Sequence, residues 1–210
     1  MMHTGYLSVA PDGSPVHSFH PVPSAWCCAS HVLGLPLETD RLGAAVHEAG
    51  HLVAALVGGI HVIDVGLTSE EALFPCGPIH GVSGVTQTGP MAVHPDRYLT
   101  MLAAGELAHQ RWLRDSGLFT PAKAWAVERG AVDDMGKAVG VLREYFPGIP
   151  DDGYRQRFWQ YRPAAETLLA THWGRVLNVA GSLGSRGHLG GDEAAALARL
   201  PNPPEPASDL

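Results

Sequence analysis

The stretch that decides the fold is LGAAVHEAGHLVAALVGGI, residues 42–60. Its apolar residues recur every three or four positions, which predicts an amphipathic helix with one buried face. Thr39 or Asp40 can cap the start of this helix, and the glycine pair Gly58 and Gly59 is a natural stop at its end. We therefore predict a helix from about residue 38 to Gly58.

The centre of this helix carries the pentapeptide HEAGH, His47 to His51. Residues four apart lie on the same face of a helix, so both imidazoles can reach one Zn²⁺ at about 2.0–2.1 Å. Glu48 lies about 100° around the helix from His47, beside the metal rather than on it. From there its carboxylate can take a proton from a water molecule that the metal activates. The pattern predicts a zinc hydrolase in which Glu48 is the catalytic base.

The third metal ligand is not defined by this pentapeptide. A catalytic zinc normally has three protein ligands and a water, and HEAGH supplies two. A third His six residues after the second is excluded, because that position is Val57. The downstream candidates are Glu106, His109, Asp133 and Asp134. Glu106 would make a thermolysin-like site, whereas either aspartate would be a carboxylate ligand from a later helix.

The rest of the chain predicts a mainly α fold with a small β-sheet, the α+β class. Strands are expected at 60–67 and 79–88, with a Gly/Pro-rich excursion between them. Helical patterns cover residues 95–117, 121–145, 163–183 and 192–200. The main domain then spans 37–200, preceded by an extended or partly ordered arm at 1–36 and followed by a disordered Pro-rich tail at 201–210.

Composition and charge exclude several classes of partner. The chain has 14 Lys and Arg against 21 Asp and Glu, a formal net charge of −7. That balance argues against binding to nucleic acid or to an anionic membrane surface. The longest apolar stretch contains His47, Glu48 and His51, which a bilayer would penalise heavily, so we expect no membrane span.

Cysteine use and the amino-terminal sequence indicate a reducing compartment. Three cysteines cannot form a closed set of disulfides. Cys27 and Cys28 are adjacent rather than spaced as zinc ligands, so we expect small buried apolar residues, and Cys76 lies in a Gly/Pro turn. The first residues lack the basic and apolar regions of a signal peptide. We therefore expect a cytoplasmic protein.

Several segments together resemble the peptidase domain of FtsH-type zinc metalloproteases, over residues of about 41–200. They are HEAGHLVAAL at 47–56, GIHVIDVGLTS at 59–69, HGVSGVTQTGP at 80–90, YLTMLAAGELAHQRW at 98–112 and GAVDDMGKAV at 130–139. The first and last of these are the most specific. They stand in the same order as the corresponding segments of that family, but the chain contains no Walker A sequence.

The resemblance implies a zincin-like helical metallopeptidase domain, and the lack of a Walker A sequence implies that it works without ATP. The resemblance also implies that Zn²⁺ is held by His47, His51 and Asp134, and that Glu48 is catalytic. An extended peptide, short or unfolded, would pair with the strand that contains Val82, Gly84, Val85 and Thr86. Asp133 and His109 are candidates for residues that do not touch the metal but hold one of its ligands in position. A homo-oligomer is compatible with this picture.

Two other functions stay open. The family sequence Ala-Ala-Glu-Glu is replaced by LAHQ at residues 107–110. This change and the unusual loop between the strands favour, as one alternative, a zinc hydrolase redirected to a small-molecule amide in a biosynthetic pathway. The other alternative is a non-catalytic zinc-binding scaffold in which Glu48 has lost its role.

Overall fold

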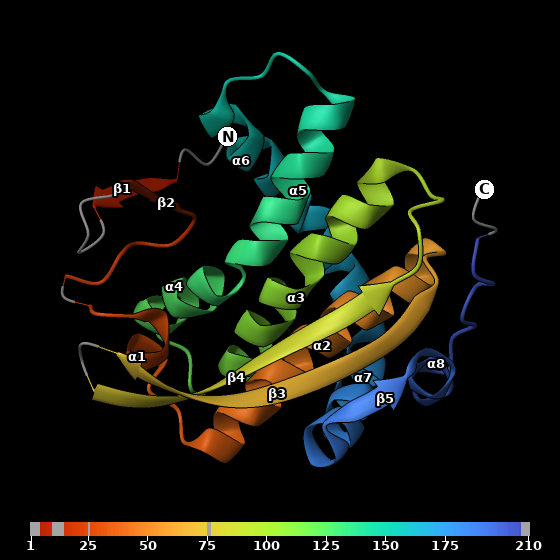
Figure 1. Ribbon diagram of the computed structural model, residues 1–210, viewed down its shortest axis with the longest axis horizontal. Coiled ribbons are helices and arrows are strands. Elements are labelled where there is room, and N and C mark those ends of the chain that lie inside the picture. Colours follow the sequence, from red (N-terminus) through yellow and green to blue (C-terminus); the bar gives the residue numbers. More distant parts are fainter. Residues whose placement is uncertain (1–4, 10–14, 25, 75–76, 207–210) are drawn as a thin grey trace.

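The computed structural model describes residues 5–9, 15–24, 26–74 and 77–206. Helix α2 (Leu37–Gly58) lies at its centre. Strand β4 (Gly77–Thr88) covers one side of α2, helix α3 (Pro95–Asp115) the opposite side, and helix α7 (Arg162–Arg186) a third side (Figure 1). The fold is mainly helical with small antiparallel sheets, which confirms the α+β prediction.

Helix α2 begins and ends where predicted, to within one residue, but its start is not capped as predicted. Gly59 adopts the left-handed conformation with φ 77°, and the N–H of Ile60 donates to the carbonyl of Ala55 at 2.9 Å, as in a Schellman motif. At the start, Pro36 is the N-cap residue and no side chain caps the helix. The prediction of a cap at Thr39 or Asp40 is therefore wrong. Pro36 already has a backbone conformation that leads into a helix, so both residues lie in the first turn.

Helices α2 and α3 approach each other closely through Gly50. A Cβ at Gly50 would lie 2.6 Å from the Cβ of Ala108 and 2.8 Å from the carbonyl oxygen of Ala104. Such distances are far below van der Waals contact, so any larger residue would push the helices apart. Both helices contribute fully buried large side chains to the core, among them Leu52, Val53, Leu99 and Leu113. This close approach brings α3 against the face of α2 that carries His47 and His51.

The main sheet has three antiparallel strands in the order β4-β3-β5. Strand β3 (Val62–Phe74) forms a long hairpin with β4, and the short β5 (His188–Gly190) pairs with β3 at residues 64–66. Residues 68–74, 77 and 78 of the expected excursion are strand, because each of them pairs across the hairpin despite the weak local pattern. Within the described ranges, no strand pairs with the outer edge of β4.

The helical block expected at 121–145 is two helices, α4 (Pro121–Gly130) and α5 (Val132–Tyr145). The helix is interrupted at Ala131, whose φ and ψ of −90° and 24° are not helical. This interruption changes the direction of the helix axis, and the first turn of α5 therefore faces α2. Helices α6 (Asp151–Trp159) and α8 (Gly191–Ala198) complete the domain, and neither α6 nor β5 was predicted.

The amino-terminal arm contains strands β1 (Tyr6–Val9) and β2 (Pro15–Ser18) and helix α1 (Ala29–Leu33). Glu128 on α4 anchors the arm by accepting hydrogen bonds from the backbone N–H groups of Phe19 at 2.6 Å and His20 at 3.0 Å. The ring of Phe19 stacks against the Arg162 guanidinium, 4.1 Å from its centroid. The arm therefore has defined contacts with α4 and α7.

The expectation that Cys27 and Cys28 are buried is wrong. Cys27 is exposed and Cys28 is half-buried, because the pair lies at the surface immediately before α1. Cys76 lies outside the described residues.

Part of the tail expected to be disordered has defined contacts. The Asn202 side chain accepts a hydrogen bond from the N–H of Val62 at 3.0 Å and donates to the Val62 carbonyl at 2.9 Å. The Pro203 carbonyl lies 2.6 Å from Nδ1 of His61. An asparagine side chain can imitate a neighbouring strand in this way, which composition alone does not reveal. Residues 207–210 lie outside the described residues.

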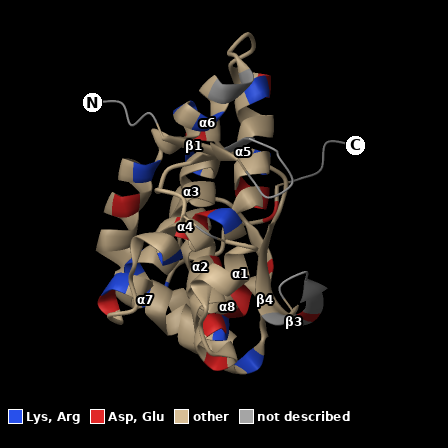
Figure 2. Ribbon diagram, turned by 90° about the vertical axis from the view of Figure 1, so that its left-hand side faces the viewer, with Lys and Arg blue, Asp and Glu red and all other residues tan. Residues whose placement is uncertain are grey.

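Charges of both signs are interspersed on α7, whereas the charged residues of α8 are both acidic (Figure 2). In the part of the chain that the structure describes, no helix has the length and apolar character needed to cross a membrane.

Candidate metal centre

His47, His51 and Asp134 converge on one point. Oδ2 of Asp134 lies 3.2 Å from Nε2 of His47 and 3.1 Å from Nε2 of His51, and the two Nε2 atoms are 3.0 Å apart. A tetrahedral Zn²⁺ with bonds of about 2.0–2.1 Å separates its ligand atoms by about 3.3 Å. The three donor atoms therefore have nearly the spacing and the chemistry of a zinc site.

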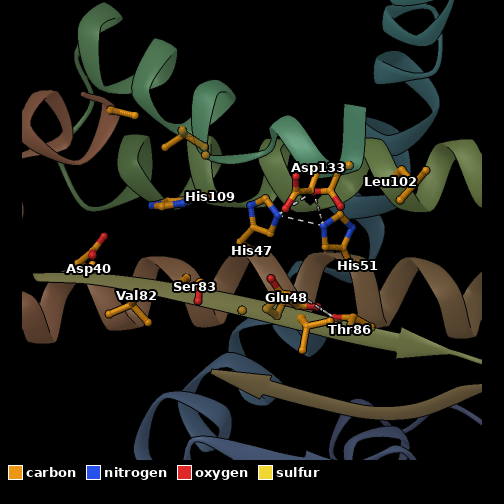
Figure 3. A pocket seen from close by; sticks show the side chains of 18 of the residues that line it. Asp40, His47, Glu48, His51, Val82, Ser83, Thr86, Leu102, His109 and Asp133 are labelled. Carbon is orange, nitrogen blue, oxygen red and sulfur yellow. Dashed lines mark hydrogen bonds and ion pairs between the residues drawn. The ribbon is translucent and has the colours of Figure 1, made fainter. Parts of the chain in front are cut away.

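Each ligand is positioned by a different structural feature. His47 and His51 are one turn apart on α2, and both imidazoles point toward the first turn of α5 (Figure 3). Asp134 lies in that first turn, immediately after the break at Ala131. Without the break, a straight helix from Pro121 would carry Asp134 away from α2.

Gly105 on α3 provides the space for the two imidazoles. A Cβ at this position would lie 2.2 Å from Nε2 of His51 and 2.7 Å from Nε2 of His47. Any side chain would thus occupy the space between the ligand atoms, so the centre requires a glycine here.

A hydrogen bond fixes the second nitrogen of His51. Its Nδ1 lies 2.8 Å from the carbonyl oxygen of Met101 and donates to it, which leaves Nε2 for the metal. Only 4% of His51 is exposed. This contact is the usual way in which proteins set the orientation and tautomer of a metal-binding histidine.

In the metal-free protein, His51 and Asp134 form an ion pair. Burial alone would lower the pKa of His51, but the charge of Asp134 and the hydrogen bond to it raise that pKa to about 9. Burial alone would raise the pKa of Asp134, but the charges and hydrogen bonds of His51 and His47 hold it well below its ordinary value. A metal ion must therefore displace a proton from His51.

Glu48 lies between α2 and β4, where two residues of the strand position it. The Thr86 hydroxyl donates to Oε2 of Glu48 at 2.8 Å and lies 3.2 Å from the Glu48 carbonyl oxygen. A Cβ at Gly84 would lie 2.4 Å from Cγ of Glu48, so the glycine makes room for the carboxylate. Glu48 is 5% exposed and points to the strand rather than to the metal ligands (Figure 3). It is thus held beside the ligands and free of them.

These groups line a cavity of about 620 Å³ between β4, α2 and the helices that face them. The four strand residues expected to bind substrate, Val82, Gly84, Val85 and Thr86, all line it. Walls on the other sides come from α1, α3, α4 and α5. The volume is within the range of ligand-binding clefts, about 300–1,000 Å³.

The other candidates for the third ligand take different places. Glu106 is buried and pairs with Arg162 at 2.8 Å, so it does not complete a thermolysin-like site. Asp133 is exposed at the rim of the cavity. His109 also lines the cavity, with its ring centroid 6.5 Å from that of His47. Among the described residues, neither Asp133 nor His109 hydrogen-bonds to a ligand side chain.

His109 is neutral in this environment. Burial, and to a smaller extent the charge of His47, lower its pKa to about 3. Its Nε2 has no hydrogen-bond partner among the described residues and lies against Gly43, where a Cβ would be 2.5 Å from it. The ring therefore forms an uncharged wall beside His47.

Sequence reasoning missed three groups that shape the site: Met101, Gly105 and the hydroxyl of Thr86 as a partner of Glu48. Gly105 offered a signal, because a glycine inside a helix costs about 1 kcal/mol relative to alanine and needs a compensating reason. The Met101 carbonyl offered none, since every residue has a carbonyl group.

Comparison with known proteins adds no assignment to this geometry. The chain matches no protein-family model, and no curated protein matches it significantly. The resemblance to FtsH-type peptidases therefore stays a prediction.

Proposed function

We propose that the chain is a zinc-dependent, zincin-like peptidase that cleaves peptide bonds in short or unfolded substrates, as its resemblance to FtsH-type peptidase domains implies. The observation that supports this most is the meeting of His47, His51 and Asp134, with Glu48 held apart from them in the same cleft. A purely structural zinc site would have four protein ligands and would need no such carboxylate.

His47, His51 and Asp134 would hold the ion, which when bound supplies Lewis-acid polarisation of the scissile carbonyl and of a water molecule. Glu48 takes a proton from the attacking water, and the same proton then passes to the nitrogen of the leaving amine. The Thr86 hydroxyl keeps one oxygen of Glu48 in place by donating to it. The other oxygen stays available for the proton.

The strand beside the cleft supports a peptide as the substrate. β4 is the outer strand of its sheet, so its free N–H and C=O groups can pair with an extended chain. Only an unfolded or short segment can lie along a strand edge in this way. No unfolding module is needed for such a substrate.

A small-molecule amide is the second candidate. Ala29, Ser30 and Leu33 of α1 line one end of the cavity, so the amino-terminal arm bounds the cleft there. A bounded cleft suits a compact substrate better than a long chain. The reacting groups would be the same in both cases.

The test combines metal analysis with a peptide-library digest. The Glu48→Gln variant keeps zinc but loses the proton acceptor, so we expect one bound zinc per chain and turnover at least about 10²–10⁴-fold lower. His47→Ala should lose the zinc as well. Glu166→Gln, an exposed change on α7, is the matched control and should behave as wild type.

Three outcomes would contradict the proposal. Full activity of Glu48→Gln would exclude the mechanism. Wild type that binds zinc and hydrolyses small amides but no peptide would favour the second candidate. Zinc binding without any hydrolysis would favour the non-catalytic scaffold.

A further inference from the structure

One end of the cleft contains a carboxylate with no role in the proposed chemistry, Asp40. Asp40 and His47 lie on the same face of α2, seven residues apart, or about 10.5 Å along the helix axis. Asp40 lines the cavity on the side of His47 that is away from His51 (Figure 3). The carboxylate is half-buried, and burial raises its pKa above the ordinary value.

Apolar side chains line the cavity on several elements. Ala44 lies one turn along α2 from Asp40, and α1 and α4 contribute Ala29, Leu33, Ala126 and Val127 to the lining. His109 lies on the same side of His47 (Figure 3), and its neutral ring adds no positive charge. This end of the cleft is an apolar chamber with one acidic group.

No described Lys or Arg side chain pairs with Asp40. The backbone of Val82 on β4 lies beside this carboxylate and lowers its pKa, an effect smaller than that of burial. The described charged residues that line the cleft are Asp40, Glu48, Asp133 and Asp134 on the acidic side and Lys137 on the basic side. Asp134 would bind the metal and Glu48 the water, which leaves Asp133, exposed at the rim, and Asp40, half-buried inside the cleft.

Val82 also relates Asp40 to the edge of β4. Along a strand edge every second residue presents its N–H and C=O to the same side, so Val82, Gly84 and Thr86 form one set. A substrate that pairs with Gly84 and Thr86 would therefore continue toward Val82 and bring a side chain close to Asp40.

We propose that this chamber, bounded by α1 and α4, is a subsite for a lysine or arginine side chain of the peptide substrate, with Asp40 as its charged contact. The inference rests on the peptidase function proposed above. A basic side chain fits because its methylene stem lies along apolar walls while its charged end reaches the carboxylate. An extended peptide advances about 3.4 Å per residue, so the basic residue stands about three residues from the scissile bond.

The test uses peptides that are acetylated and amidated at their ends, so that only side chains carry charge. At each position within four residues of the scissile bond we compare arginine, lysine, norleucine and glutamate. We expect kcat/KM to be about 10–100-fold higher for arginine or lysine than for norleucine at one position about three residues from the bond. Glutamate there should be the poorest substrate.

Substitution of Asp40 should change this ratio. Asp40→Asn should reduce the preference for arginine over norleucine to less than about threefold, and Asp40→Lys should favour glutamate instead. Asp40→Glu keeps the charge and should retain a basic preference. Glu38→Gln removes the other acidic residue of the first turn of α2, which is exposed and does not line the cavity, so its ratio should equal that of wild type.

Binding gives a second readout that does not need turnover. Fluorescence anisotropy of labelled peptides on zinc-loaded Glu48→Gln should show the same preference, and Asp40→Asn in that background should abolish it. Cleavage without a basic preference, or a preference that survives in Asp40→Asn, would overturn this inference and leave the peptidase proposal standing. Absence of cleavage of any peptide by wild type would instead refute the peptidase proposal.

Discussion

The absence of one side chain matters as much as any ligand in this centre. Gly105 lies on α3 where a Cβ would meet Nε2 of both His47 and His51. Its neighbours Ala104 and Ala108 pack against Gly50 of α2, so moving α3 away to make room would break this close contact. The metal centre thus depends on small residues in both helices.

We predict that Gly105→Ala abolishes zinc binding because the new methyl group occupies the space between the ligand nitrogens. Gly140→Ala on α5 is the matched control, since nothing lies within 4 Å of a Cβ there. That variant should bind zinc normally and unfold with a free energy about 0.5–1 kcal/mol higher. Metal analysis and denaturant melts measure both effects, and stoichiometric zinc in Gly105→Ala would disprove the steric argument.

At the scale of elements, the contact between α4 and the amino-terminal arm holds α1 at the cleft. Glu128 accepts hydrogen bonds from the backbone N–H groups of Phe19 and His20 and lies 3.1 Å from Nδ1 of His20. It is only 9% exposed. A buried carboxylate that accepts several hydrogen bonds is costly to replace.

We predict that Glu128→Gln loosens the arm, because the amide can offer only one acceptor oxygen and leaves donors unpaired. The free energy of unfolding should fall by about 1–3 kcal/mol. Limited proteolysis should cut before α2 faster than in wild type. Glu166→Gln should show neither change, and equal cleavage rates for the two variants would show that Glu128 does not anchor the arm.

At the scale of the whole molecule, a bound metal should stabilise the fold because its ligands come from two helices far apart in the sequence. A ligand that binds the native state at a thousand times its Kd adds about 4 kcal/mol. Without a metal, the ion pair of His51 and Asp134 joins the same two helices.

We predict that the stabilisation by zinc grows with pH. The folded pKa of His51, about 9, lies above its unfolded value, so protonation stabilises the metal-free fold fully below about pH 6.5 and is lost as pH rises through 9. Zinc needs the neutral imidazole, so its advantage is larger at pH 8.5 than at pH 6. Thermal melts with zinc and with a chelator at the two pH values measure this. A shift in Tm that is equal at both values would contradict the coupling.

The sequence predicted the parts of the site that depend on local pattern. The spacing of His47 and His51 in an amphipathic stretch placed both imidazoles on one face of α2, and the glycine pair placed its end. The choice among the downstream acidic residues depended on the break at Ala131 and on the pairing of Glu106 with Arg162. Both are tertiary effects, and from residue spacing alone the choice stayed open.

Strand lengths and the carboxyl-terminal segment were harder to predict for the same reason. Residues 68–74 form a strand because they pair with the other strand of the hairpin. Asn202 has a defined position because its side chain hydrogen-bonds to Val62. Contacts between residues distant in the chain leave little trace in local composition.

The hydrogen bonds between Asn202 and Val62 have a consequence for self-association. β5, Gly187 and Asn202 together cover the edge of β3 from Val62 to Leu67. In this half of the sheet the edge of β3 is therefore covered, whereas β4 presents a long edge beside the cleft. Two molecules that paired through the edges of their β4 strands would block each other's clefts. Dimers formed by strand addition would therefore be inactive, and dilution would restore activity.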